Sequence, residues 1–347
     1  MKNVRSPFLL PFCAAVAGCV AGCAPSRADS GSSAGDELEK AIQKTMEALL
    51  SDPASVPPEN RRVFVRGGGK VAAVAPGLGG RLMFFGAKGG TNALWNAPEG
   101  APVEAGWRNW GGEKTWVGDM SLWRGFDPKG RRWPPPAWFD QDEFEWWHPW
   151  QSTDLAGPHR LSLRQPAHAS GDWNVALERD FILEDGRLVV RETLLPEPAD
   201  APQPPPEPDD PHRIWSVTQV PFAPRLAARL CGEGRTKPSA GFPEEPTERH
   251  GDWVVFDLSA APDKAALAAD ADALAVEGPA GWLVVSQRAD ARFLGAFGAP
   301  GRALVYTTGA KPDDPAAAYT ELEFVALGRD AEHEIGFRIV PQGGAPW

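Results

Sequence analysis

Two glutamates, Glu321 and Glu323, stand two residues apart in the segment YTELEF, where polar and apolar residues alternate. Alternation with a period of two predicts a β-strand and places both carboxylates on one face of it. A carboxylate next to a ligand can act as a general base. Two carboxylates on a buried face also need a positive partner, because unpaired buried charge is costly. We expect that partner to be Arg81, and a buried charge pair without a catalytic role is the alternative interpretation.

Tryptophan is concentrated in one part of the chain. Ten of the fifteen tryptophans lie between residues 95 and 150, and the stretch WRNWGGEKTWVGDMSLW carries Asn109, Trp110, Lys114 and Trp116. Flat indole faces match the C–H faces of sugar rings, while amide and ammonium groups hydrogen-bond hydroxyls, so this combination predicts a sugar-sized pocket. The alternative is that these tryptophans fill the end of a core.

The elements that position these residues are predicted to be short strands. Most of the chain after Arg62 consists of alternating runs separated by glycine and proline, and Asp185-Gly186 is a tight hairpin signal. About a dozen strands with hardly a helix predict an all-β fold, an antiparallel sandwich. The expected strands are 62–65, 71–75, 81–85, 161–164, 173–183, 187–195, 214–220, 253–258, 282–286, 303–307, 319–326 and 332–340.

Length and charge limit the organisation and the partners. The chain has 347 residues, which is enough for one large β domain, expected over residues 62–347. The proline-rich stretch 196–211 is predicted to be a solvated insertion between two strands. A net charge of −11 without a basic cluster argues against nucleic acid as a partner.

The N-terminus has the features of an export signal. Basic residues precede the apolar run Phe8–Ala17, which is too short to span a bilayer but suits a signal peptide over residues 1–22. Val20–Cys23 resembles the lipobox of bacterial lipoproteins, which predicts Cys23 as the lipidated residue; Cys19 ends a second copy of the pattern. A flexible tether and a short amphipathic helix are expected over residues 23–61. Because Pro25 is not aspartate, we expect an outer-membrane lipoprotein that faces the periplasm.

Other chemistries find little support. After lipidation Cys231 would be the only unmodified thiol, apart from cysteines in the removed leader, so no disulfide framework is expected. The acidic run Asp140–Glu145 could offer oxygen ligands to calcium, but it lacks the spacing of a calcium loop, and a solvated acidic face is the preferred interpretation. We expect neither a metal nor a cofactor.

Six motifs together resemble a known family. They resemble a bacterial domain-of-unknown-function lipoprotein family that is itself similar to the galactose mutarotase-like, or aldose epimerase, superfamily. The motifs are APGLGGRL from Ala75, NALWN from Asn92, NWGGEKTW from Asn109, WPPP from Trp133, IWSVTQ from Ile214 and YTELE from Tyr319.

This resemblance extends over about Arg62 to Val340 and implies a β-supersandwich with a sugar-sized cleft on a concave sheet face. In mutarotases a glutamate takes the proton from the anomeric hydroxyl and a histidine protonates the ring oxygen. Glu321 or Glu323 matches the glutamate, whereas the strand IWSVTQ contains no histidine and Lys114 is a candidate substitute. The substrate-binding candidates are Arg81, Asn109, Trp110, Trp116, Trp133, Trp215 and Gln219.

Three functions remain open at this stage. The first is a carbohydrate-active enzyme, an aldose 1-epimerase-like sugar isomerase. The second is a lipid-anchored carbohydrate-binding protein without catalysis, and the third is a structural lipoprotein. The expected partners are a sugar or oligosaccharide and, through the N-terminal lipid, a membrane.

Overall fold

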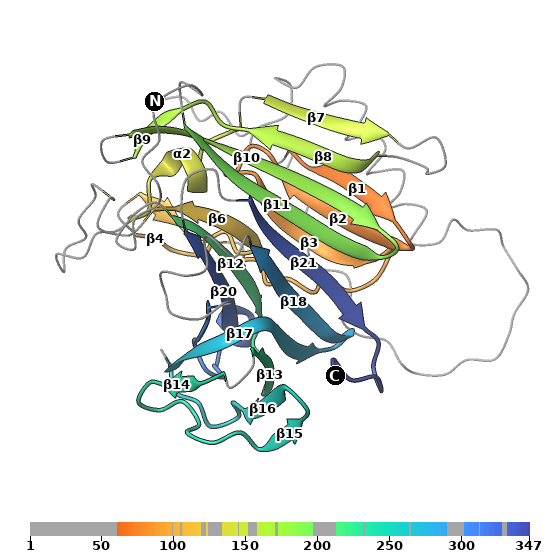
Figure 1. The fold of residues 1–347 in the computed structure, drawn as a ribbon, viewed down its shortest axis with the longest axis vertical. Helices are drawn as coiled ribbons and strands as arrows, with labels where there is room; N and C mark the ends of the chain where they lie inside the picture. The colour runs from red at the N-terminus through yellow and green to blue at the C-terminus, as the bar shows by residue number, and fades with distance from the viewer. Residues whose placement is uncertain are drawn as a thin grey trace, which may run out of the picture.

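The computed structural model describes most of the chain after residue 60 as antiparallel β-sheet, which confirms the predicted fold class (Figure 1). The described residues are 61–98, 100–104, 106–118, 123, 134–144, 146–151, 158–170, 173–196, 213–231, 234–263, 265–289, 302–311, 313–327 and 332–347. The predicted signal peptide, Cys23, the tether helix and most of the proline-rich insertion lie outside them. None of the helices in these ranges has the length and apolar character needed to cross a bilayer.

The strands form two layers, and the first carries the candidate site. All its neighbouring strands pair antiparallel. In spatial order this layer contains β1 (Val63–Gly67), β2 (Lys70–Ala75), β3 (Arg81–Ala87), β6 (Glu113–Val117), β12 (Arg213–Pro221), β20 (Tyr319–Leu327), β19 (Arg302–Thr307), the first half of β17 (Ala265–Gly278) and β14 (Thr236–Pro238).

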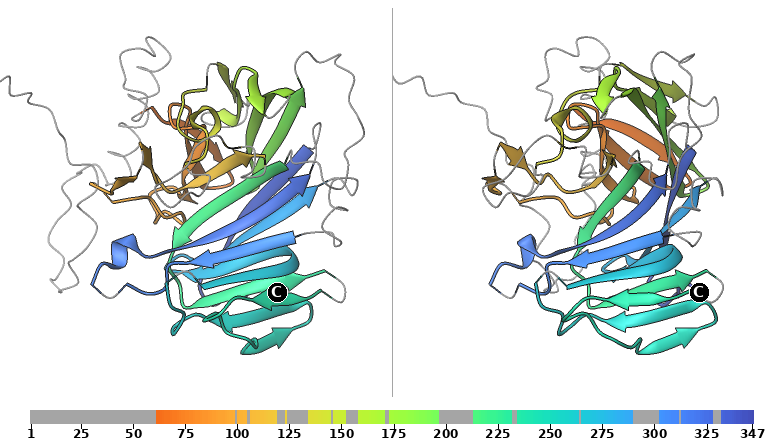
Figure 2. Two further views of the ribbon diagram at one scale, coloured as in Figure 1. Left: turned by 90° about the vertical axis from the view of Figure 1, so that its left-hand side faces the viewer. Right: turned by 60° about the vertical axis from the view of Figure 1, so that its left-hand side comes forward.

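The second layer packs against the first, and β17 joins the two, because its first half pairs with β19 and its second half with β18. In spatial order it contains β7 (Trp146–Gln151), β8 (Pro158–Arg164), β10 (Trp173–Glu184) with β9 (His168–Ser170), β11 (Arg187–Pro196), β21 (Glu332–Val340), β18 (Gly281–Ala289), the second half of β17, β13 (Arg225–Leu230), β16 (Trp253–Asp257) and β15 (Glu248–His250). Figure 2 shows the strands β13 to β17, drawn in blue-green to cyan, in the lower part of the molecule.

A few short elements complete the described part of the chain. They are β4 (Val103–Glu104), β5 (Trp107–Arg108), the helix α2 (Ala137–Asp140) and the 3-10 turn η5 (Pro315–Ala317). The helix α2 contacts β6 in the first layer. It therefore lies beside the tryptophan-rich segment.

The core lies between the layers and follows from the alternation in the sequence. Phe85 of β3 meets Phe337 of β21 with ring centroids 6.1 Å apart, and both side chains are fully buried. Burial of aromatic and branched side chains from both inner faces provides the main stabilisation of such a sandwich. The predicted hairpin is present: Asp185 and Gly186 have φ angles of 50° and 74°, and they connect β10 to β11.

Candidate functional site

Six side chains converge on one face of three neighbouring strands. The register places Lys114 of β6 opposite Val217 of β12, and Val217 in turn opposite Glu323 of β20. Since side chains alternate between faces, residues two apart share a face with these. We call this set the outer-face site; its members are Lys114, Trp116, Trp215, Gln219, Glu321 and Glu323.

The alternation of β6 explains why the site faces away from the second layer. Glu113 and Thr115 point inward, where they bind Arg179 of β10 and Glu192 of β11. Lys114 between them must therefore point outward. The polar groups of the site thus lie on the face of the first layer that points away from the second layer.

The two glutamates each accept a hydrogen bond from β12. Gln219 Nε2 donates to Glu321 Oε1 at 2.6 Å, and Trp215 Nε1 donates to Glu323 Oε2 at 2.8 Å. Burial raises the pKa of both carboxyls, and with the added repulsion from Glu321 the pKa of Glu323 reaches about 8. Lys114 and the Gln219 amide act in the opposite direction on Glu321. Glu323 therefore favours its protonated form at neutral pH, and the pKa of Glu321 is raised as well, against the pull of Lys114 and Gln219.

Lys114 is a buried cation without a hydrogen-bond acceptor among the described residues. Its side chain is 1% exposed, and no acceptor among the described residues reaches its Nζ. The ammonium lies 4.7 Å from the ring centroid of Trp116 and 5.5 Å from that of Trp107. Burial, together with the positive charge of Arg81, lowers the pKa of Lys114 to about 8.

Besides the Lys114 donor, Gln219 has an acceptor atom that is unpaired within the described part of the chain. Its side chain is fully buried, and its Oε1 has no donor among the residues that the structure describes. Buried polar atoms are nearly always hydrogen-bonded in folded proteins. A ligand hydroxyl has both a lone pair, which could accept from Lys114, and an O–H group, which could donate to Gln219.

Tryptophans form a wall beside the site, and α2 fixes their orientation. Trp116 Nε1 donates to Asp140 Oδ1 at 2.8 Å, Trp110 Nε1 donates to Gln141 Oε1 at 3.0 Å, and Trp107 Nε1 donates to the other oxygen of Asp140. The Trp116 ring is also part of the main hydrophobic cluster. This residue therefore both borders the site and fills the core, the two roles expected for the tryptophans. Trp133 lies outside the described residues.

Asp140 corrects two predictions. It was expected on a solvated acidic face, but it is fully buried and forms a 2.7 Å ion pair with the fully buried Arg81. Burial would raise the pKa of Asp140, yet Arg81 and Lys114 hold it below its ordinary value. The expected pairing of Arg81 with the glutamates is therefore wrong. Two strands, β6 and β12, separate β3 from β20, a distance of about 14 Å across the sheet.

Asn109 lies near the glutamate strand. Asn109 hydrogen-bonds the hydroxyl of Tyr319, and burial followed by repulsion from Glu321 raises the pKa of that tyrosine. The Tyr319 ring packs on Trp95 with centroids 4.5 Å apart. Tyr306 pairs directly with Glu321 from β19, and burial raises its pKa to about 12.

Sequence reasoning missed Asp140, Gln141 and Tyr306. No strand or helix periodicity precedes Asp140, and only its aromatic neighbours hinted that the segment is buried. Of the described histidines, His333 is buried between the layers at 3.1 Å from Glu192, and His168 stacks on a tryptophan. Neither of these two histidines belongs to the outer-face site, and the described part of the chain holds no group of three or more potential metal ligands.

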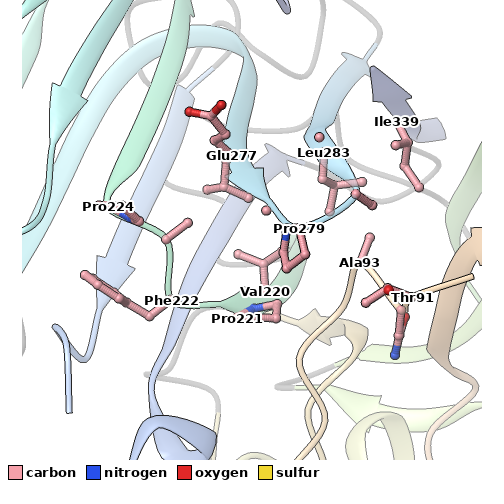
Figure 3. A pocket seen from close by; sticks show the side chains of 16 residues that line it. Thr91, Ala93, Val220, Pro221, Phe222, Pro224, Glu277, Pro279, Leu283 and Ile339 are labelled. Carbon is pink, nitrogen blue, oxygen red and sulfur yellow. The ribbon is translucent and has the colours of Figure 1, made fainter. Parts of the chain in front are cut away.

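A cavity of about 340 Å³ lies elsewhere (Figure 3). Its lining includes Ala93, Val220, Phe222, Glu277, Leu283 and Ile339. Val220 follows Gln219 on β12 and therefore faces the opposite side of the sheet. No member of the outer-face site lines this cavity, so the cavity and the cluster of polar side chains are two different places. We take the unpaired buried polar groups as the more specific indication of a ligand site.

The fold defines the class of the protein as a large antiparallel β-sandwich. Neither a family model nor a curated protein matches the chain. Similar solved structures include a proposed aldose 1-epimerase from Escherichia coli K12 (14% identity, 81% of this chain and 99% of that one, TM-score 0.47). Galactose mutarotase-like proteins from Lactobacillus casei ATCC 334 (10%, 80% and 98%, 0.48) and Clostridium acetobutylicum (8%, 80% and 94%, 0.46) are also similar. The chemistry of the site has to be derived from its own side chains.

Proposed function

We propose that the outer-face site binds an uncharged aldose and catalyses proton transfer at its anomeric centre, as an aldose 1-epimerase-like isomerase. The single observation that carries this proposal is the buried ammonium of Lys114, which has no acceptor among the described residues. A protein gains no stability from a buried charge in that state, so a ligand oxygen is the natural partner.

The charge balance of the site favours a neutral ligand. Arg81 and Asp140 neutralise each other, and Lys114 faces two carboxyls whose pKa values are both raised by burial, to about 8 for Glu323. A strongly anionic ligand would meet the carboxyl pair, and a cationic ligand would meet Lys114. Polyols carry donors and acceptors without net charge, and their C–H faces can pack on the indole rings.

The roles in the reaction follow from the protonation states. Glu321 takes the proton from the anomeric hydroxyl, because the Gln219 amide and Lys114 both favour its anion. Lys114 gives a proton to the ring oxygen, so that the bond between this oxygen and the anomeric carbon breaks. The open chain recloses on either face of the aldehyde and yields the other anomer, with both protons returned.

The absence of a histidine on the described part of this face supports a second candidate, a carbohydrate-binding protein without turnover. A lysine with a pKa of about 8 is a weaker acid than an imidazolium and protonates the ring oxygen less readily. A site with this lysine would bind the sugar while its ring stays closed. The two candidates share the ligand and differ only in whether the ring opens.

Polarimetry of freshly dissolved aldoses tests the proposal. We expect Glu321→Gln to abolish catalysed mutarotation and to keep sugar affinity within a few-fold, because the amide retains the shape but cannot take a proton. Glu178→Gln is the control, since Glu178 sits in an exposed ion pair with Arg164. Full turnover in Glu321→Gln would refute the assignment, and binding without turnover in the wild type would leave the binding-protein candidate.

The setting of this activity is also a proposal. The Cys23 pattern supports a lipid-anchored protein at the outer membrane that faces the periplasm. A sugar site in that compartment would meet saccharides that enter the cell envelope.

A further inference from the structure

Lys114 has a second chemical capacity besides acid catalysis. A lysine that is desolvated among aromatic rings and next to another cation is the environment in which amines become nucleophiles at neutral pH. Lys114 has all three features: it is 1% exposed, its ammonium lies over the rings of Trp107 and Trp116, and Arg81 acts on it electrostatically. Its Nζ is also not engaged by an acceptor in the described part of the chain.

The proposed ring opening would create an electrophile at the same place. Once Lys114 has given its proton to the ring oxygen, it is a neutral amine next to the atom that was bonded to the anomeric carbon. That carbon is now an aldehyde. The nucleophile and the electrophile therefore arise in one step, on either side of the former ring oxygen.

We propose that Lys114 forms an imine with the aldehyde carbon of the open-chain aldose. This inference rests on the proposed function and extends it from proton transfer to covalent chemistry. The lone pair of Nζ attacks the carbonyl carbon, and one N–H proton passes to the carbonyl oxygen to give a carbinolamine. The carboxyl proton of Glu323 then moves to the hydroxyl, which leaves as water, and an iminium remains beside the Glu323 carboxylate. Water reverses the sequence.

Glu323 is suited to this role by its place in the sheet. It lies in the same cross-strand row as Lys114, with only Val217 between them, and Trp215 fixes one of its oxygens at 2.8 Å. Its other oxygen remains for proton transfer. A carboxyl that keeps its proton at neutral pH can protonate a leaving hydroxyl.

Reductive trapping tests the inference. The full chain is incubated at pH 7 with an aldose and, separately, with glyceraldehyde, a three-carbon aldehyde that cannot form a six-membered ring, each with cyanoborohydride. Peptide mass spectrometry then locates lysines that have gained the mass of the sugar less one oxygen. The lower pKa gives Lys114 a roughly 300-fold larger fraction of free amine than an ordinary lysine at this pH. We expect labelling of Lys114 at least about tenfold faster than labelling of the exposed Lys237 on β14.

The outcomes separate this inference from the proposed function. Label on Lys114 from both reagents supports both. Label from glyceraldehyde alone supports the reactive lysine and removes the ring-opening activity. Catalysed mutarotation with label only on exposed lysines overturns the imine and leaves the proposed function intact. Lys114→Arg keeps the positive charge but removes the nucleophilic amine, so the peptide with this substitution must stay unlabelled. The pattern of labelled lysines in the wild type tests the inference even if the variant does not fold.

Discussion

Replacing Lys114 by methionine should stabilise the protein while it abolishes function. The pKa of Lys114 falls from 10.5 to about 8 on folding, which corresponds to about 3 kcal/mol of stability lost through burial of the charged form. Methionine has a similar shape and packs well against aromatic rings. The pKa of about 8 already includes the attraction of Lys114 for Glu321 and Glu323, and a shape-conserving core substitution costs up to about 1.5 kcal/mol, so we expect a net gain of about 1 to 2 kcal/mol.

The sign of this effect depends on pH in a defined way. A lysine whose folded pKa is lowered destabilises the fold fully below about pH 8, and this penalty fades as the pH rises towards 10.5. The advantage of Lys114→Met should therefore be constant through the neutral range and shrink above pH 8. The gain corresponds to an increase in Tm of about 2 to 8 °C.

The assay is urea unfolding at pH 7 and at pH 10, with tryptophan fluorescence as the signal. Lys237→Met is the matched control; its side chain is exposed, and its effect should stay within about 0.5 kcal/mol. A loss of more than about 1 kcal/mol in Lys114→Met would refute the reasoning, because it would mean that the ammonium is a paired structural group. Such a result would also weaken the case for a ligand at this position.

Three further predictions follow from the buried carboxylates and from the leader. Asp140→Asn should lower the free energy of unfolding in urea by about 3 to 5 kcal/mol, because it leaves the Arg81 charge buried without its counter-ion. The control Asp142→Asn, at an exposed position, should change this free energy by less than about 0.5 kcal/mol, and equal effects of the two substitutions would contradict the prediction. The folded pKa of Glu323 is raised, so its contribution to stability is present below about pH 4.5 and is lost as the pH rises to about 8. Glu323→Gln should flatten this decline of the unfolding free energy between about pH 4.5 and 8, and an unchanged slope would contradict the raised pKa of Glu323. Mass spectrometry of the mature protein should find Cys23 as a lipidated first residue, and a free Cys23 thiol would exclude the lipid anchor there.

The strands that were predicted are those with clear alternation, such as β10, β11 and β20. The longest strand, β17, escaped because its sequence AALAADADALAVEG is rich in alanine, which favours helix, although its burial does alternate. β6 escaped for a different reason. It buries Glu113 and Lys114 in a five-residue segment, and a binary pattern never assigns charged residues to a buried strand.

The candidate site was predictable in its parts and not in its assembly. The glutamates on one face followed from the period of two, and the importance of the NWGGEKTW segment followed from its composition. The contact between them depends on β12 lying between β6 and β20, although Gln219 and Glu321 are 102 residues apart. Strand order of this kind is a property of the whole sheet. The same reason explains why Arg81, on the far side of β6, was assigned to the wrong carboxylate.

The two faces of β6 differ in how their buried charged groups are paired. On the inner face, Glu113 accepts from Arg179 at 2.6 Å, and Glu192 accepts from Thr115 and lies 3.1 Å from His333. These buried carboxylates are all paired, as the cost of burying charge requires. Lys114, one residue from Glu113 on the same strand, is equally buried and has no acceptor within the described chain. This contrast within the described residues supports the proposal that the ammonium of Lys114 binds a partner from outside the chain.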